Sequence, residues 1–206
     1  MRSRFLRARR VGEHAVLVEC GDADAVAATY ATLREAAAGL GAVDVVPAAR
    51  TVLLDGLPDA AATLSVLGDL AAAPLAQVTT APLVEIPTRY DGEDLEEVAR
   101  QWAVSTSEVV RIHQAATFTV LFCGFAPGFA YCTGLPEGLR VSRRSDPRPR
   151  VRAGSVALAA EYTSVYPSAS PGGWQLIGTT EVELWRPEAA DPALLTPGAT
   201  VRFVDG

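Results

Sequence analysis

The sequence predicts an α+β fold that becomes mostly β, with a small α+β domain over residues 1–80 and a β-rich domain over residues 81–206. Strand-like and helix-like segments alternate before residue 71. Prolines over residues 71–82 then break both periodicities, so this stretch is the expected linker. Beyond it, glycines and prolines separate short runs of Val, Phe, Tyr and Thr, which favours a compact barrel or rolled sheet.

The elements of the first domain follow from hydrophobic periodicity. An arginine-rich first strand precedes an apolar strand over residues 15–18. Residues 24–40 are alanine-rich and predict a helix, which Gly39 and Gly41 end. Two more strands and a second helix are expected over residues 43–47, 51–54 and 60–70. This order indicates a sheet backed by helices.

The second domain opens with a strand over residues 83–87 and continues with two helices. The first, over residues 93–103, is amphipathic. Ser105 and Glu108 form a capping box that begins a short helix ending near residue 115. The remainder is rich in strands and turns.

Composition excludes several classes of function. A net charge of −6 disfavours a dedicated nucleic-acid binder. The chain contains no lysine, which excludes a Schiff-base lysine, a biotinyl-lysine and a P-loop. No long apolar run predicts a transmembrane helix or a signal peptide, so a cytoplasmic location is expected. Three cysteines without a C-x-x-C pair, and only two histidines, give no framework for a metal site.

Two features near the middle of the second domain could carry chemistry. Residues 124–131, with the sequence GFAPGFAY, follow a strand and predict a tight turn anchored by aromatic side chains. His113 lies one strand earlier, on the same helical stripe as Val109. It is either a half-buried histidine with satisfied hydrogen bonds or an acid–base or phosphate-binding group, and the residues favour neither alternative.

Two later segments could bind anions. Six arginines lie between residues 140 and 152, and Pro147 and Pro149 hold the segment extended. Guanidinium groups there suit a carboxylate or phosphate, although a solvated run of charge is the alternative for most of them. Residues 170–178 contain a Gly-Gly pair that either exposes backbone amides to an anion or forms a tight hairpin.

Three of these segments together resemble a known family. The sequences GFAPGFAYCTGL, SRRSDPRPRVRAGSV and YPSASPGGWQLIGTT resemble the family that contains the B-type subunit of 5-oxoprolinase, the kinase inhibitor KipI and allophanate hydrolase subunit 1. They are also similar to part of the carboxyltransferase region of urea amidolyase. The resemblance implies a small α+β first domain, here of ferredoxin-like type, and a cyclophilin-like β-barrel second domain. It does not imply prolyl isomerase activity.

The resemblance also implies a function. The chain is expected to be one part of a heteromeric, ATP-dependent amidohydrolase, inactive alone, that converts 5-oxoproline to glutamate. Its partners would be a C-type subunit, which completes the active site, and an A-type subunit, with ATP and Mg bound at the level of the complex. The alternatives are a KipI-like inhibitor of a sensor histidine kinase, and a component of an enzyme of allophanate hydrolase or urea carboxylase type.

Site residues are carried over from the matching positions. Arg143 and Arg148 would hold a carboxylate or phosphate, and His113 would transfer a proton. Gln175 and the amides of the Gly-Gly pair would bind carbonyl or phosphate oxygens. The catalytic set is His113, Arg143 and Gln175, and the substrate-binding or anion-binding set is Arg148, Gly172, Gly173, Tyr131, Phe129 and Ser155.

The chain also departs from the family pattern. Ser142 and Arg152 stand where prolines are expected, and Cys132-Thr133 replaces a Leu-Gly pair. Ala160, Tyr162 and Ser164 occupy a stretch that is usually richer in glycine. A bulkier Tyr162 near the pocket would change which substrate fits.

Overall fold

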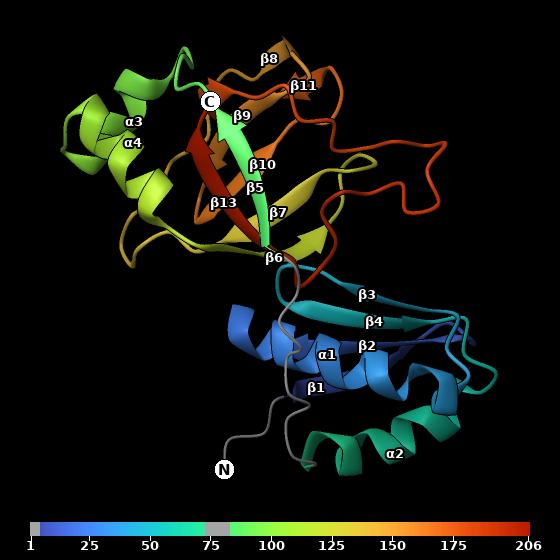
Figure 1. Ribbon diagram of the computed structural model, residues 1–206. Coiled ribbons are helices and arrows are strands. Elements are labelled where there is room, and N and C mark those ends of the chain that lie inside the picture. Colours follow the sequence, from blue (N-terminus) through green and yellow to red (C-terminus); the bar gives the residue numbers. More distant parts are fainter. Residues whose placement is uncertain (1–4, 73–82) are drawn as a thin grey trace. The chain divides into compact units, whose positions relative to one another are not determined.

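The computed structural model describes residues 5–72 and 83–206, which belong to two compact units, Met1–Ala81 and Pro82–Gly206 (Figure 1). Most of the expected linker at 71–82 lies outside the described residues. Among the described helices, none is long and apolar enough to cross a membrane.

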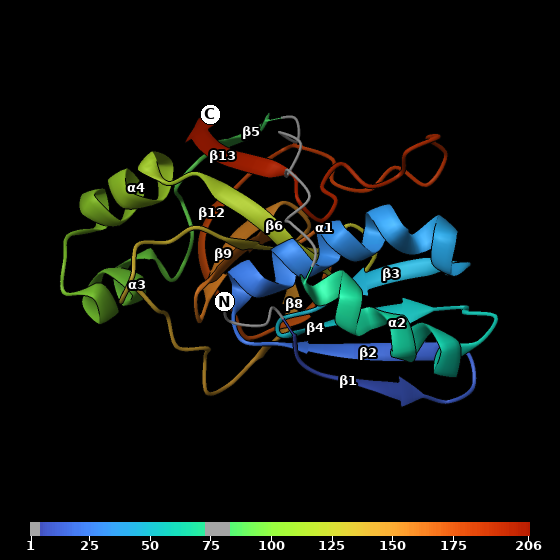
Figure 2. The same cartoon turned by 90° about the horizontal axis from the view of Figure 1, so that it is seen from below.

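The first unit is a four-stranded antiparallel sheet with two helices. Its strand order is β1-β2-β4-β3, which is visible in Figure 2. Strands β2 and β3 are joined by helix α1 and are both antiparallel to β4, which lies between them. This is the split β-α-β arrangement of ferredoxin-like folds. The bounds are β1 (Phe5–Val11), β2 (Ala15–Cys20), α1 (Ala23–Leu40), β3 (Asp44–Pro47), β4 (Thr51–Asp55) and α2 (Ala60–Ala72).

The core of this unit follows from alternation along the strands. Val16 and Val18 of β2 are buried and pair with Leu54 and Val52 of β4, so one face of the sheet is apolar. Helix α1 contacts β2, β3 and β4, whereas α2 contacts β1 and β2. The α1 helix begins where Asp22 accepts a hydrogen bond from the Ala25 amide.

The second unit contains a seven-stranded sheet of order β12-β9-β10-β7-β6-β13-β5 and a two-stranded pair, β11-β8. Helices α3 and α4 pack against each other and contact β12 and β13 respectively. The α4 helix begins at the expected cap, since Ser105 Oγ accepts from the Glu108 amide at 3.2 Å. The bounds are β5 (Leu83–Thr88), α3 (Leu95–Trp102), α4 (Thr106–Ala115), β6 (Phe118–Cys123), β7 (Ala130–Thr133), β8 (Arg148–Val151), β9 (Ser155–Ala159), β10 (Tyr162–Val165), β11 (Ser170–Gly172), β12 (Gln175–Thr179) and β13 (Thr200–Asp205).

The seven-stranded sheet is nearly closed into a barrel. Its first and last strands meet where Arg89 and Thr179 exchange two backbone hydrogen bonds of 2.9 and 2.7 Å. Gly178 permits this approach, because a Cβ there would lie 2.3 Å from the carbonyl oxygen of Arg89. The expected change from α+β to a β-rich barrel is therefore confirmed, and the closure brings β12 next to the segment that leads into α3.

Strand β9 separates two apolar clusters. Val156 and Leu158 belong to the larger one, which includes residues from α3 and α4. Ala157 and Ala159 point the other way, into a smaller cluster that contains Phe129, Tyr166 and Trp174. Because both faces of β9 are buried, the strand has no polar face, and its two sides support different parts of the molecule.

Candidate functional site

A cluster of aromatic side chains packs together in the second unit. Phe129 and Tyr166 are each 1% exposed, and the Phe129 ring lies edge-on to Tyr166 and Trp174, with centroids 5.3 and 5.4 Å apart. Tyr131 is half-buried and extends the cluster toward Tyr162. The cluster provides a rigid apolar wall, which is a common lining of small-molecule sites.

Arg143 lies against this wall. Its guanidinium is 5.9 Å from the Trp174 ring centroid, within cation–π range. Burial raises the pKa of Tyr131 and Tyr166, and the positive charge of Arg143 opposes the rise in the pKa of both. Within residues 5–72 and 83–206 no carboxylate pairs with Arg143, and its side chain is exposed. Its charge is therefore available to an anionic group.

The loop at 124–131 is held in an unusual backbone conformation. Phe125 has φ of +71°, a left-handed value that bulky residues rarely adopt, and it is 64% exposed. Gly128 also has positive φ, and a Cβ there would lie 2.8 Å from the Trp185 Cβ. The expected aromatic anchoring is present, since Phe125 meets Phe129 edge-on at 5.3 Å.

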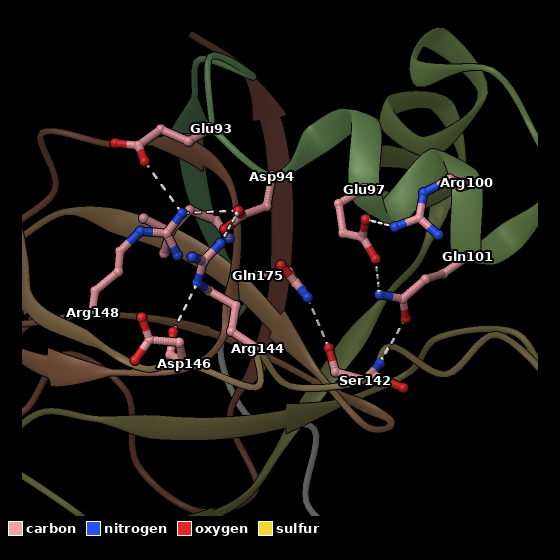
Figure 3. A network of polar contacts seen from close by, with 11 residues as sticks. Glu93, Asp94, Glu97, Arg100, Gln101, Ser142, Arg144, Asp146, Arg148 and Gln175 are labelled. Carbon is pink, nitrogen blue, oxygen red and sulfur yellow. Dashed lines mark hydrogen bonds and ion pairs between the residues drawn. The ribbon is translucent and has the colours of Figure 1, made fainter.

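The buried Asp94 is the centre of an ionic network (Figure 3). One of its oxygens accepts from Arg144 at 3.1 Å and from Arg148 at 2.8 Å, while the other accepts from the Leu176 amide at 2.7 Å. Arg148 also reaches Glu93 at 3.2 Å. Two arginines of the basic segment are thus neutralised within the protein. For Arg148, a role in anion binding would require competition with Asp94.

Sequence reasoning missed Asp94. It stands at the N-cap of α3, where an aspartate ordinarily bonds to the first backbone amides, but it makes no such bond here. Its only sequence signal is an acidic pair before a helix, together with a basic segment about fifty residues later in the chain. That signal does not identify which charges meet, because the closure of the barrel decides it.

A pocket of about 400 Å³ opens beside this network. Of the nine predicted site residues, Arg143 and Gln175 line it. The remaining lining residues are Asp94, Glu97, Gln101, Ser142, Arg144, Ser145 and Asp146. The pocket therefore combines one unpaired guanidinium with polar groups that are largely engaged with each other.

Two glutamines in the pocket differ in what they leave available. Gln101 is bonded at both ends, since its oxygen accepts from the Ser142 amide at 2.7 Å and its nitrogen donates to Glu97 at 2.7 Å. Gln175 donates to the Ser142 carbonyl at 3.0 Å, but its buried Oε1 has no partner. The expected donation from Gln175 to a carbonyl or phosphate oxygen stays a prediction: one N–H of that nitrogen is used by Ser142, and the buried oxygen is the end without any partner.

His113 lies in the core and does not line the pocket. It is 0% exposed, its Nδ1 lies 2.9 Å from the Tyr90 hydroxyl, and its Nε2 lies 2.9 Å from the Thr163 hydroxyl. Thr163 donates onward to the Ala157 carbonyl, so Nε2 carries the proton and Tyr90 donates to Nδ1. Burial lowers the pKa of His113 to about 3. The geometry thus favours the structural alternative, since both nitrogens are occupied, and the proton-transfer role stays a prediction.

Gly172 and Ser155 also have structural explanations. A Cβ at Gly172 would lie 2.2 Å from the Tyr166 hydroxyl, so this position needs glycine for packing. Neither Gly172 nor Gly173 has the positive φ that an anion-binding nest requires. Ser155 is buried at the start of β9. The nest is therefore absent at the two glycines, and oxygen binding by their amides stays a prediction.

Metal and thiol chemistry find no support in the part of the chain that the structure describes. No group of three or more His, Cys, Asp or Glu residues gathers there as metal ligands would. All three cysteines are free, and burial raises the pKa of Cys123 to about 11. A thiolate nucleophile at Cys123 would be scarce at neutral pH.

Comparison with known proteins decides the family. The family model described as "Carboxyltransferase domain, subdomain C and D" matches residues 6–195. The chain belongs to this family. The resemblance seen in the sequence motifs is therefore confirmed.

Curated relatives are similar to this chain over part of its length. The B-type subunit of 5-oxoprolinase from Bacillus subtilis (strain 168) is 47% identical over 125 residues, which are 59% of this chain and 52% of that protein. The same-named protein of Escherichia coli O157:H7 is 48% identical over 124 residues, 59% of this chain and 57% of that protein. The alignment thus spans a little over half the length of these relatives.

Solved structures confirm the fold. The crystal structure of TTHA0988 has a TM-score of 0.77 and 35% identity, covering 94% of this chain and 40% of that one. The K. lactis urea amidolyase has a TM-score of 0.73 and 19% identity, covering 97% of this chain and 15% of that one. The second likeness concerns the fold alone, and with the nearly closed sheet it confirms the cyclophilin-like barrel after a small α+β domain.

Proposed function

We propose that this chain is one component of an ATP-dependent amidohydrolase complex that converts 5-oxoproline to glutamate, together with C-type and A-type partner subunits. The observation that carries the proposal is the unpaired Arg143 at a pocket, in a chain whose curated relatives are named as the B-type subunit of 5-oxoprolinase. 5-Oxoproline carries one carboxylate, which suits one guanidinium.

The pocket is better suited to binding than to completing the reaction. Arg143 would hold the carboxylate, and the aromatic wall behind it would exclude water from one side. No histidine or cysteine lines the pocket. Asp94 is occupied by two arginines, and Glu97 pairs with Arg100 and Gln101. The group that attacks the lactam would therefore come from a partner, which is why we propose that this chain is inactive alone.

This pocket on its own offers ATP little positive charge. Arg143 is its one unpaired guanidinium, Arg144 is paired with Asp94, and the carboxylates of Glu97 and Asp146 also line it. The proposal therefore keeps ATP and Mg at the level of the complex and derives no step of this chain from them.

A second candidate is a KipI-like inhibitor of a sensor histidine kinase. One observation favours it: Phe125 is 64% exposed and is held in a left-handed conformation, as a residue presented to a protein partner would be. An inhibitor would depend on Phe125 and would tolerate the loss of Arg143. The urea carboxylase-type alternative has the fold in common with this chain, and its substrate would be tested in the same assay.

The test is reconstitution. ATP-dependent release of glutamate from 5-oxoproline is measured with this chain co-purified with its C-type partner and with the A-type partner added. We expect activity that disappears when this chain is omitted and falls about 100-fold in Arg143→Met, the size typical of losing one charge-stabilising group. Arg150→Met is the matched control, an exposed arginine of the same segment outside the pocket, and it should keep wild-type activity.

The outcomes separate the candidates. Full activity without this chain, or in Arg143→Met, would contradict the proposal. A stable complex that hydrolyses allophanate but not 5-oxoproline would move the substrate while keeping the architecture. Inhibition of a histidine kinase that is lost in Phe125→Ser and kept in Arg143→Met would favour the second candidate.

A further inference from the structure

We infer that Gln175 selects substrates that carry an N–H group, by accepting one hydrogen bond from it at the buried amide oxygen Oε1. The inference rests on the proposed function, because it specifies which part of a small amide substrate the pocket recognises. It predicts that amides bind and that esters or lactones of the same shape are rejected.

The direction of this hydrogen bond is fixed by the protein. The Gln175 amide nitrogen lies 3.0 Å from the Ser142 carbonyl oxygen and donates to it. Rotating the amide by 180° would place two oxygens against each other, so the network determines which end of the amide points where. Oε1 is the end left over, and an amide oxygen can only accept.

The free acceptor is buried, and it belongs to a residue that lines the pocket. Gln175 is 3% exposed, and Oε1 is one of the few buried side-chain atoms in the described residues without a hydrogen-bond partner. A buried acceptor without a donor is costly, commonly about 1–3 kcal/mol, so such atoms are rare in folded proteins. An N–H group brought by a ligand would satisfy it.

The acceptor is also held in place before any ligand arrives. Gln175 is the first residue of β12 and pairs with Leu158 of β9. The next residue, Leu176, donates its amide to Asp94, which is itself fixed by two arginines. The ionic network therefore positions the strand that carries the acceptor. Ligand binding would then have to order little of this part of the site.

Arg143 and Gln175 line the same pocket and together define a ligand. One binds an anion and the other accepts from a donor, so the ligand carries a carboxylate and an N–H group close together. In 5-oxoproline the ring nitrogen is bonded to the carbon that carries the carboxylate, so both features are neighbours. Replacing N–H by oxygen would place an acceptor against Oε1.

Equilibrium binding to the complex of this chain with its C-type partner tests the inference. The first pair of probes is 5-oxoproline and its lactone analogue, in which oxygen replaces the ring N–H. The second pair is malonamate, an open-chain amide carboxylate, and its ester counterpart, monomethyl malonate. We expect the N–H member to bind about 10- to 100-fold tighter than its oxygen analogue, the effect of leaving one buried acceptor unpaired.

Two variants locate the effect. Gln175→Met removes Oε1 and should reduce the preference for N–H to less than about threefold. Gln101→Met is the matched control: it removes a glutamine from the same pocket whose two ends are both bonded within the protein, and it should keep the preference. The wild-type comparison stands even if Gln175→Met fails to fold.

The outcomes distinguish this inference from the proposed function. Preference for malonamate over its ester, without binding of 5-oxoproline, would overturn 5-oxoproline as substrate and support the role of Gln175. Binding of 5-oxoproline and its lactone with equal affinity would support the substrate and overturn the inference. Absence of binding for all four probes would overturn both.

Discussion

Arg143 and Arg148 come from the same basic segment and differ in what surrounds them. Arg148 is 14% exposed and bonds to Asp94, whereas Arg143 is exposed, rests over Trp174 and has no carboxylate partner in the described residues. Both side chains end in a guanidinium group, so the two residues differ in their surroundings and not in their chemistry. The difference shows that one buried carboxylate, Asp94, gives Arg148 a structural role, whereas Arg143 remains available to bind a ligand.

Removing that carboxylate should produce the largest effect on stability. In Asp94→Asn, Arg148 stays mostly buried and keeps only the exposed Glu93 as a counter-charge, and the Leu176 amide is left with a poorer acceptor. We expect a loss of about 3 kcal/mol in the free energy of unfolding, at the lower end for a broken buried pair because Arg144 is 35% exposed. Chemical denaturation measures it.

Asp146→Asn is the matched control, because this exposed carboxylate lines the same pocket and has no ion pair with the described residues. It should change the free energy of unfolding by less than about 0.5 kcal/mol. Equal losses in both variants would contradict the central position of Asp94.

The buried His113 should make stability depend on pH. Burial lowers its pKa in the folded protein to about 3, below the ordinary value near 6.5, so the unfolded chain binds the proton first. Stability should therefore be complete above about pH 6.5 and fall by about 1.4 kcal/mol per unit as the pH drops toward 3. His113→Gln keeps a donor and an acceptor in place and should show a shallower fall. Parallel curves for the two proteins over pH 6 to 4 would refute this.

A substitution that relieves backbone strain should increase stability, by less than the loss of Asp94 decreases it. Ala160 departs from the glycine-rich family pattern and has φ of +52°, a left-handed value that a Cβ disfavours. Ala160→Gly should raise the free energy of unfolding by about 1 kcal/mol, or the melting temperature by about 2–4 °C. Calorimetry would detect it, and a lower melting temperature would show that the Cβ contributes packing which outweighs the strain.

Most of the fold could be predicted from the sequence, because it depends on local patterns. The alternation in β2, the helix stop at Gly41 and the cap at Ser105 are each encoded within a few residues. The site could be predicted only in part. Arg143 and Gln175 came from the resemblance, but the same motifs also indicated His113 and Gly172, which have packing roles here.

What could not be predicted depends on contacts between distant residues. Asp94 meets Arg148 across about fifty residues because the barrel closes between Arg89 and Thr179. Ser142 stands where a proline was expected, and its amide donates to Gln101, a bond that proline could not make. Only the folded chain reveals that the carbonyl of the same serine engages the Gln175 nitrogen and leaves its oxygen free.

The most direct test compares the unfolding of Arg143→Met with that of Arg148→Met. Methionine keeps an unbranched apolar stem at each position and removes the charge. The account predicts that Arg148→Met loses about 2 kcal/mol in the free energy of unfolding, whereas Arg143→Met changes by less than about 0.5 kcal/mol. Equal losses, or a larger loss for Arg143→Met, would contradict the division of this segment into a structural and an available arginine.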